Sequence, residues 1–141
     1  MSKPRIAPYG AWTSPITSDL IVSATVRLSS AMLDHGTVYW LEGRPTEGGR
    51  SVIVKRMPDG STVDVNPPPT NARTRVHEYG GGAVIICDDT VYFSNFSDQR
   101  LYRATAGTAP EPITPDTELR YANGLVDRRR DRIICVREDH R

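Results

Sequence analysis

The chain has 141 residues, of which 38% are hydrophobic and 25% are charged, and its formal net charge at pH 7 is +1. This length and composition are typical of one globular domain and exclude a disordered chain. The near-neutral charge argues against a nucleic-acid-binding protein, and no run approaches the ~20 apolar residues that a membrane-spanning helix needs.

The first 28 residues are expected to form an arm ahead of the folded domain. Residues 1–18 contain three prolines and no periodic pattern, which is typical of an extended chain. No apolar run follows the basic residues near the N-terminus, so we predict no secretory signal. Residues 19–33 mix apolar with small polar side chains, and both a strand and a short connector are compatible with that pattern.

From residue 29 onwards the chain has the pattern of β structure. Short runs rich in branched and aromatic residues alternate with turn signals such as Asp34-His35-Gly36 and Asp59-Gly60. The expected strands of the first unit are residues 38–41, 52–54 and 62–65, with residues 43–50 as a long hairpin loop. The same order returns at residues 83–87, 91–94, 101–103 and 111–114, and it begins a third time at residues 122–127 and 133–136.

The spacing of matching turns predicts the architecture. Gly36 and Asp89, which precede two Thr-Val-Tyr copies, stand 53 residues apart, and Asp89 and Asp131 stand 42 apart. Units of roughly 40–50 residues with four strands are typical of β-propeller blades. We therefore predict an all-β partial propeller of about two and a half four-stranded antiparallel blades, at residues 29–69, 82–116 and 121–141.

A partial propeller of this size is expected to be the front piece of a larger protein. Closure needs at least about four blades, and an open arrangement exposes unpaired strand edges. No stretch shows a sustained helical period, so helix content is expected to be low.

The two cysteines point to a reducing compartment. Cys87 and Cys135 each lie in an apolar run, and neither has a second Cys or a His at a metal-binding spacing. We interpret them as small hydrophobic side chains, with a disulfide as the alternative. We therefore expect a cytoplasmic protein.

The segment Arg73–Gly82 is the main candidate for a functional loop. It places charged and aromatic side chains next to three consecutive glycines, just before the apolar strand at 83–87. Because the first strand of a propeller blade is the innermost, a loop that leads into it is expected near the mouth of the central channel. The candidate substrate-binding residues are Glu78, Arg73, Arg75, Tyr79 and Glu138.

Each candidate also has a structural interpretation. Glu78 is either an anchor for a ligand ammonium group or the ion-pair partner of Arg73 or Arg75. Tyr79 either stacks on a ligand or packs at the strand entrance. The polar end of the chain, Arg137–His140, faces either a central channel or solvent.

Other features of the repeats allow two interpretations as well. Trp40 and Phe93 occupy matching places, and we interpret them as packing between blades rather than as binding residues. The loop at 43–50 has two arginines and three glycines and is interpreted as a hairpin tip, with an anion cradle as the alternative. The run Arg128–Arg130 is interpreted as a solvated turn, with a phosphate site as the alternative.

The chain carries no catalytic motif of its own. It has no nucleophile elbow, P-loop, dinucleotide-binding turn or EF-hand loop. His77-Glu78 begins like a zinc-protease helix motif, but Gly81 stands where the second histidine belongs. We therefore predict no catalytic residue, metal site or cofactor in this chain, and no catalysis by the chain alone.

Several segments occur together in one order: Trp40-Leu41-Glu42-Gly43-Arg44-Pro45 with Gly48-Gly49-Arg50, then Arg73–Gly82, then Val91-Tyr92-Phe93-Ser94-Asn95-Phe96 with Asp98-Gln99-Arg100-Leu101-Tyr102. In this order they resemble the prolyl oligopeptidase family of serine peptidases, in its dipeptidyl- and acylaminoacyl-peptidase branch. The resemblance runs from about Ala7 to Arg141, nearly the whole chain.

The resemblance implies an N-terminal β-propeller that caps an α/β-hydrolase domain and filters peptide substrates by size. It also implies that the catalytic Ser, Asp and His lie in that further domain, which this chain lacks. In some relatives, propeller carboxylates hold the free amino terminus of a peptide. Glu78 and Glu138 are candidates for that role, although neither matches a family motif with an assigned function.

Two functions therefore compete at this point. The first is the propeller fragment of a cytoplasmic serine peptidase, with a peptide substrate and an α/β-hydrolase domain as its partners and with no nucleic acid or membrane. The second is a propeller that serves as a non-catalytic binding or scaffolding module. A continuation of the protein into a Gly-x-Ser-x-Gly segment would decide for the first.

Overall fold

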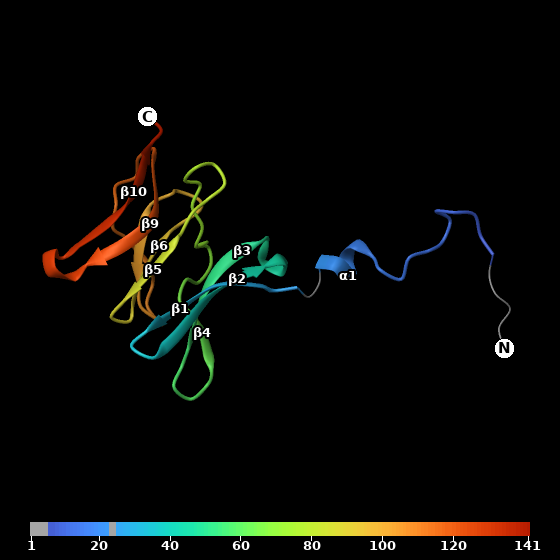
Figure 1. Cartoon of the computed structure of the whole chain (residues 1–141), viewed down its shortest axis with the longest axis horizontal. Helices are drawn as coiled ribbons and strands as arrows, with labels where there is room; N and C mark the ends of the chain where they lie inside the picture. Colours follow the sequence, from blue (N-terminus) through green and yellow to red (C-terminus); the bar gives the residue numbers. More distant parts are fainter. Residues whose placement is uncertain (1–5, 23–24) are drawn as a thin grey trace.

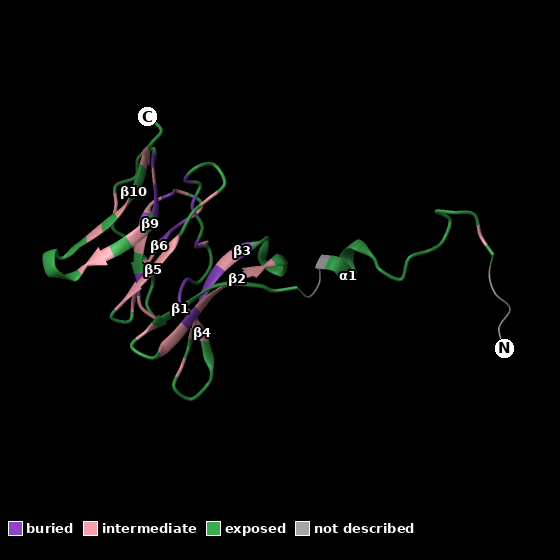
Figure 2. Ribbon diagram, viewed as in Figure 1, coloured by how far each residue is buried: buried purple, intermediate pink, exposed green. Residues whose placement is uncertain are grey.

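The computed structural model describes residues 6–22 and 25–141, so residues 1–5 and 23–24 of the predicted arm lie outside the described residues. In Figure 1 the described arm extends away from the sheets, and Figure 2 shows it almost entirely exposed. It contains one short helix, α1 (Ser18–Val22), where a strand or connector was expected from residue 19 onwards. Thr17 caps this turn, since its Oγ1 accepts a hydrogen bond from the Leu20 amide at 3.1 Å.

The rest of the described chain forms three antiparallel sheets. The first has the order β1 (Arg27–Asp34), β2 (Thr37–Arg44), β3 (Arg50–Arg56) and β4 (Thr62–Asp64), and the second has the order β5 (Val84–Cys87), β6 (Thr90–Ser94), β7 (Leu101–Ala104) and β8 (Glu111–Pro112). The third is the hairpin of β9 (Leu119–Asp127) and β10 (Arg132–Asp139). The predicted all-β fold of four-stranded antiparallel sheets is confirmed.

The main core lies between the first two sheets. Its fully buried side chains come from both of them and from the loop between them: Tyr39, Ile53, Val65, Ala72, Val91, Phe93 and Ala104. Because successive strand residues face opposite sides of a sheet, Tyr39 faces the second sheet and Trp40 faces away from it. The expected packing between blades is therefore made by Phe93 and Tyr39, while Trp40 is half-buried on the other face of the first sheet.

The long loop predicted at 43–50 is shorter in the structure. Strand β2 continues to Arg44 and β3 starts at Arg50, and the 3-10 turn η1 (Pro45–Glu47) with two glycines joins them. Gly48 and Gly49 have φ angles of 67° and 77°, which only glycine adopts readily, so they close a tight hairpin. The pattern at 43–50 hid two strand ends because glycines and charged residues are rare in strands.

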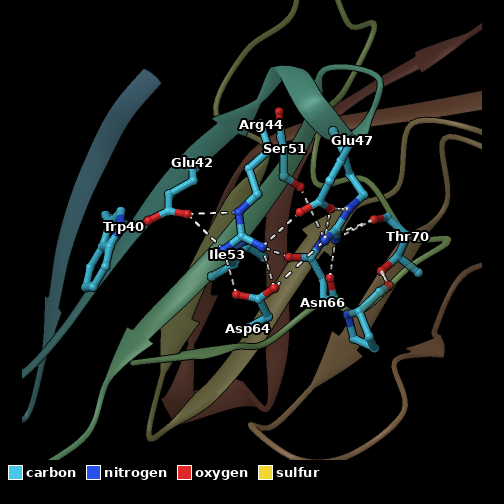
Figure 3. A network of polar contacts seen from close by, with 11 residues as sticks. Trp40, Glu42, Arg44, Glu47, Ser51, Ile53, Asp64, Asn66 and Thr70 are labelled. Carbon is cyan, nitrogen blue, oxygen red and sulfur yellow. Dashed lines mark hydrogen bonds and ion pairs between the residues drawn. The ribbon is translucent and has the colours of Figure 1, made fainter. Parts of the chain in front are cut away.

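A polar network explains why the strands extend so far (Figure 3). The Arg44 guanidinium donates to both oxygens of Asp64, at 2.6 and 2.8 Å, and to Glu42 at 2.9 Å. The buried Arg50 donates to Glu47 at 2.6 Å and to the Asn66 carbonyl at 2.7 Å. These carboxylates neutralise both arginines, so the hairpin tip does not cradle an anion.

The third sheet packs beside the second. Strand β9 runs along β5, and the Asn123 amide donates to the Gly82 carbonyl at 2.7 Å. A Cβ on Gly124 would stand 2.0 Å from Cδ1 of Ile85, so any larger residue at this position forces the Ile85 side chain to move. The turn between β9 and β10 contains the 3-10 segment η2 (Arg128–Arg130), in which Arg128 pairs with Asp88 at 2.9 Å.

Cys87 and Cys135 are both free and half-buried. Cys135 packs against a second, smaller core cluster, as expected for a small hydrophobic side chain. Cys87 instead lies beside Arg128, whose Nε stands 3.1 Å from the Cys87 sulfur. The predicted disulfide alternative is therefore wrong.

Candidate functional site

The candidate loop lies at one end of the sheets, which we call the entry rim and define by the first residues of β1, β5 and β9: Arg27, Val84 and Leu119. Strands β1, β5 and β9 run in the same direction. The end of β1 meets the end of β5 through Asp34 and Asp89, and the end of β5 meets the end of β9 through Asp88 and Arg128. The segment Arg73–Gly82 crosses this rim from the first sheet to the second (Figure 1).

Alternate residues in the first half of the loop are buried in the core. Ala72, Thr74 and Val76 are buried, so Arg73 and Arg75 point outwards. The Arg73 amide donates to the Ser94 carbonyl at 2.9 Å, and the Arg75 amide donates to Oε1 of Gln99 at 2.7 Å. The backbone beneath the two arginines is therefore fixed.

The motif that follows β6 provides this support. The side-chain carbonyl of Asn95 accepts the Asn71 amide at 3.0 Å, and Asn95 forms an isolated bridge with Ala72. Gln99 is buried, and its Oε1 accepts the hydrogen bond from the Arg75 amide. The segment Asn95–Gln99, singled out in the sequence, thus holds the candidate loop in place.

Arg73 and Arg75 share one aromatic neighbour. Their guanidinium carbons lie 4.9 and 4.5 Å from the centre of the Phe96 ring. A ring face attracts a cation, by about 0.5–1 kcal/mol at exposed sites. Among the described residues, neither guanidinium has a carboxylate partner.

The second half of the loop is a tight turn that displays Glu78 and Tyr79. His77 and Glu78 have φ angles of 58° and 63°, a conformation uncommon for residues other than glycine. The Glu78 amide donates to the Arg75 carbonyl and the Gly80 amide to the Val76 carbonyl, both at 2.9 Å. As a result the Glu78 side chain is 77% exposed.

The carboxylate of Glu78 pairs with Arg120, not with Arg73 or Arg75. Nη1 of Arg120 lies 2.7 Å from Oε1 of Glu78 and 3.0 Å from the Arg75 carbonyl oxygen. The interpretation that Arg73 or Arg75 holds Glu78 is therefore wrong. Their attraction to Phe96 turns both guanidinium groups towards the ring.

Glu138, near the end of β10, reaches the same turn. Its Oε1 accepts the His77 amide at 2.8 Å and lies 3.2 Å from Nδ1 of His77, while Oε2 lies 3.1 Å from Nε2 of His140. The hydrogen bond from the His77 amide, followed by that from His140, lowers the pKa of the Glu138 carboxyl. Glu138 therefore supports the turn that carries Glu78.

Tyr79 is free to meet a ligand. The residue is 87% exposed, and its ring is stacked on that of His77 at 5.9 Å between centroids. The alternative that it packs at the strand entrance is therefore not the arrangement seen.

Two of the three glycines have a defined backbone role. Gly80 has a φ angle of 100°, which favours glycine. Gly82 donates to Oδ1 of Asn123 at 2.7 Å, and a Cβ on Gly82 would stand 2.8 Å from that oxygen. The glycines thus bring the loop close to β9.

A cavity of about 500 Å³ opens beside the loop. It lies between the start of β1, the end of β2 and the segment 72–84, and Arg27, Arg73 and Tyr79 are among its lining residues. Its other walls are small or apolar residues, including Ser29, Ser30 and all three loop glycines.

All five candidate residues lie in the described chain, four in the loop and Glu138 beside it. Arg120, Asn123 and Phe96, which position the loop, were not predicted from the sequence. Phe96 was part of a quoted motif, whereas Arg120 and Asn123 carried no signal because they lie about 40 residues from their partners. Among the described residues, no group of three or more His, Cys, Asp or Glu side chains could hold a metal ion.

Known structures resemble this chain over most of its length. A puromycin-hydrolysing peptidase of Mycobacterium tuberculosis superposes on 93% of the chain with a TM-score of 0.79 and 36% sequence identity. A puromycin hydrolase superposes on 90% of the chain with a TM-score of 0.74 and 35% identity. A serine-to-alanine mutant of a puromycin hydrolase, complexed with PGG, gives the same TM-score and coverage with 33% identity.

The chain spans 21% of the length of each of these peptidase chains. No protein-family model and no curated protein sequence matches the chain. Within the described residues, the fold contains no helix that is long and apolar enough to cross a membrane.

Proposed function

We propose that this chain, which is related over nearly its whole length to the N-terminal propeller region of peptidases of the prolyl oligopeptidase family, serves a serine peptidase as part of its propeller. In this role it covers a catalytic α/β-hydrolase domain and limits which peptides reach it. The observation that carries the proposal is the 33–36% identity to peptidases over at least 90% of the chain.

The topology of the sheets supports a partner domain at the entry rim. The chain enters the first sheet at Arg27, and four antiparallel strands return it to the same rim, where Asp64 of β4 meets Arg44 and Arg50. Each further four-stranded antiparallel sheet would likewise begin and end on this rim. A domain joined to either end of the propeller therefore lies on the side of the candidate loop.

Peptide substrates then pass the side chains displayed on this rim. The exposed Glu78 carboxylate offers a partner for the ammonium group of a free peptide amino terminus, and Arg120 holds that carboxylate in place. Tyr79 offers an aromatic face next to it. Glu138 acts as a positioning residue because its two oxygens are engaged by His77 and His140.

A chimeric enzyme tests the proposal. The stretch of the M. tuberculosis peptidase that superposes on this chain is replaced by the chain, and puromycin hydrolysis is measured. We expect a folded enzyme with kcat/KM within about tenfold of the parent, a difference of about 1.4 kcal/mol. A chimera that is folded by circular dichroism and monodisperse, yet inactive towards puromycin and peptides, would favour a binding or scaffolding module instead.

A further inference from the structure

We propose that the cavity between the first two sheets at the entry rim binds a carboxylate group of a peptide, with Arg27 and Arg73 as its cationic residues. The inference rests on the proposed function in one respect, namely that the ligand is a peptide. It adds the chemistry of the ligand group and the place where that group binds.

The charge of the cavity wall is the first observation. Arg27 and Arg73 line the cavity, and the described lining includes no Asp or Glu. Most side chains that line it are small, so they leave the space of about 500 Å³ open to a ligand. A wall that carries positive charge and no carboxylate attracts an anionic group such as a carboxylate.

The two arginines also differ from three other arginines of the sheets. Arg44, Arg50 and Arg120 each pair with a carboxylate. Within the described chain, Arg27 and Arg73 have no such partner, and Arg73 contacts only the Phe96 ring through its guanidinium. Their fork of N–H donors therefore remains available, and it matches the geometry of a carboxylate.

The backbone of β1 is irregular where it borders the cavity. Strand β1 has a bulge between Ser29 and Met32, and Ser30 within it has a φ angle of 52°. Bulges often redirect side chains next to binding sites. Ser29 and Ser30 both line the cavity, and their hydroxyl groups have no hydrogen-bond partner within residues 6–22 and 25–141.

The position of Arg73 is fixed before any ligand binds. Its backbone is held by the Ser94 carbonyl, its neighbours Ala72 and Thr74 are buried, and Phe96 supports its guanidinium. Such preorganisation reduces the entropic cost of binding. Arg27, at the start of β1, lines the same cavity.

Calorimetry on the whole chain tests the proposal with a matched set of short peptides. The first has neutral side chains and a free C-terminal carboxylate, the second is its C-terminal amide, and the third is an amide with one Glu side chain. We expect the two peptides that carry a carboxylate to bind at least about tenfold more tightly than the amide without one. The comparison of the first with the third shows which source of carboxylate the cavity prefers.

Three variants locate the site. Arg73→Gln and Arg27→Gln are each expected to weaken binding of the carboxylate peptides at least about tenfold and to leave the neutral amide unaffected. Arg56→Gln is the matched control. Arg56 is an exposed arginine at the opposite end of the first sheet, so its substitution removes the same charge away from the cavity. Circular dichroism and thermal unfolding show whether each variant is folded.

Three results would overturn the inference: equal binding of the acid and the amide, equal losses in Arg56→Gln and Arg73→Gln, or binding of inorganic phosphate without any binding of peptide. The measurement needs no catalytic domain. A chain that fails to bind leaves the chimera test of the proposed function standing, whereas an inactive chimera leaves peptide binding by the chain unaffected.

Discussion

Arg120 joins the third sheet to the candidate loop, because its Nη1 lies 2.7 Å from Oε1 of Glu78 and 3.0 Å from the Arg75 carbonyl oxygen. The two charged residues are 42 positions apart in the chain. Since Glu78 is 77% exposed and Arg120 19% exposed, solvent screens the pair, and its contribution to global stability is small. Its effect is to select one orientation of the Glu78 carboxylate.

We therefore expect Arg120→Met to loosen the loop without unfolding the protein. The Glu78 side chain and the Arg75 carbonyl both lose a donor, so amide hydrogen exchange should become faster at His77–Gly82. The free energy of unfolding should change by less than about 1 kcal/mol. Exchange measured by NMR checks this, and unchanged exchange rates in the loop would show that Arg120 does not hold it.

The second prediction concerns the contact between Glu138 and His77 and its effect on stability at different pH values. Hydrogen bonds from the His77 amide and from His140 lower the pKa of the Glu138 carboxyl below its ordinary value of about 4.5. A carboxyl whose pKa is lower in the folded state stabilises the fold above its ordinary pKa, and this contribution disappears as the pH falls through the folded-state pKa.

The melting temperature of the wild-type chain should therefore fall below pH 4.5 more steeply than that of Glu138→Gln. At pH 7 the variant should melt at a lower temperature than the wild type, because the charge-assisted bond is lost. Parallel curves for the two proteins between pH 7 and pH 3 would contradict this explanation.

A third prediction concerns the contact between the first two sheets. Tyr39 is fully buried, and its hydroxyl donates to Asp89, which also pairs with Lys55. Burial, followed by the hydrogen bond to Asp89, raises the pKa of Tyr39, so the phenol stays protonated. Tyr39→Phe keeps the packing and removes one bond to a charged group, which typically costs about 1.5–3 kcal/mol.

The matched control is Tyr92→Phe, since Tyr92 occupies the same place in the second copy of the Thr-Val-Tyr segment. Within the described chain its hydroxyl has no hydrogen-bond partner. Urea unfolding should therefore give a change below about 0.5 kcal/mol for Tyr92→Phe. Equal losses in the two variants would show that the bond between Tyr39 and Asp89 adds no stability.

The packing of β9 on β5 makes a fourth prediction. A Cβ at residue 124 would stand 2.0 Å from Cδ1 and 2.9 Å from Cγ1 of Ile85, so Gly124→Ala forces the Ile85 side chain to move. Overpacking of this kind costs about 1–3 kcal/mol. Gly43→Ala serves as the control because its Cβ would meet only an ordinary contact, 3.5 Å from the Cβ of Arg27. Urea unfolding of both variants checks the difference.

The sequence predicted those parts of the fold that depend on local pattern. Val91 and Phe93 alternate with polar or half-buried neighbours, so β6 was placed within one residue of its observed bounds. The loop at 43–50 was misjudged because Arg44 and Arg50 owe their strand positions to Asp64 and Asn66, which lie further along the chain.

The candidate loop was found for its composition, but its contacts were not. Charged residues beside three glycines identified Arg73–Gly82, and nothing local indicates that Phe96 attracts both arginines or that Arg120 reaches Glu78. Helix α1 was missed for a different and local reason, because five residues are too few to show a helical period. Long-range pairing is the information that a single sequence does not carry.

The last prediction concerns Glu78 in the chimeric peptidase. Glu78→Gln keeps the shape of the side chain and its contact with Arg120 but removes the negative charge. If Glu78 anchors the ammonium group of a peptide, kcat/KM for peptides with a free amino terminus should fall about tenfold or more. N-acetylated peptides of the same sequence should be spared, because they carry no ammonium group to pair with the carboxylate.

Two further variants separate an anchoring role from a structural one. Glu138→Gln alters the support of the turn but leaves the exposed carboxylate of Glu78 in place, so it should affect free and acetylated peptides equally. Glu78→Asp keeps the charge on a shorter side chain and should recover part of the preference for free amino termini. An equal loss on both peptide classes in Glu78→Gln, together with a lower melting temperature, would reduce Glu78 to a structural partner of Arg120.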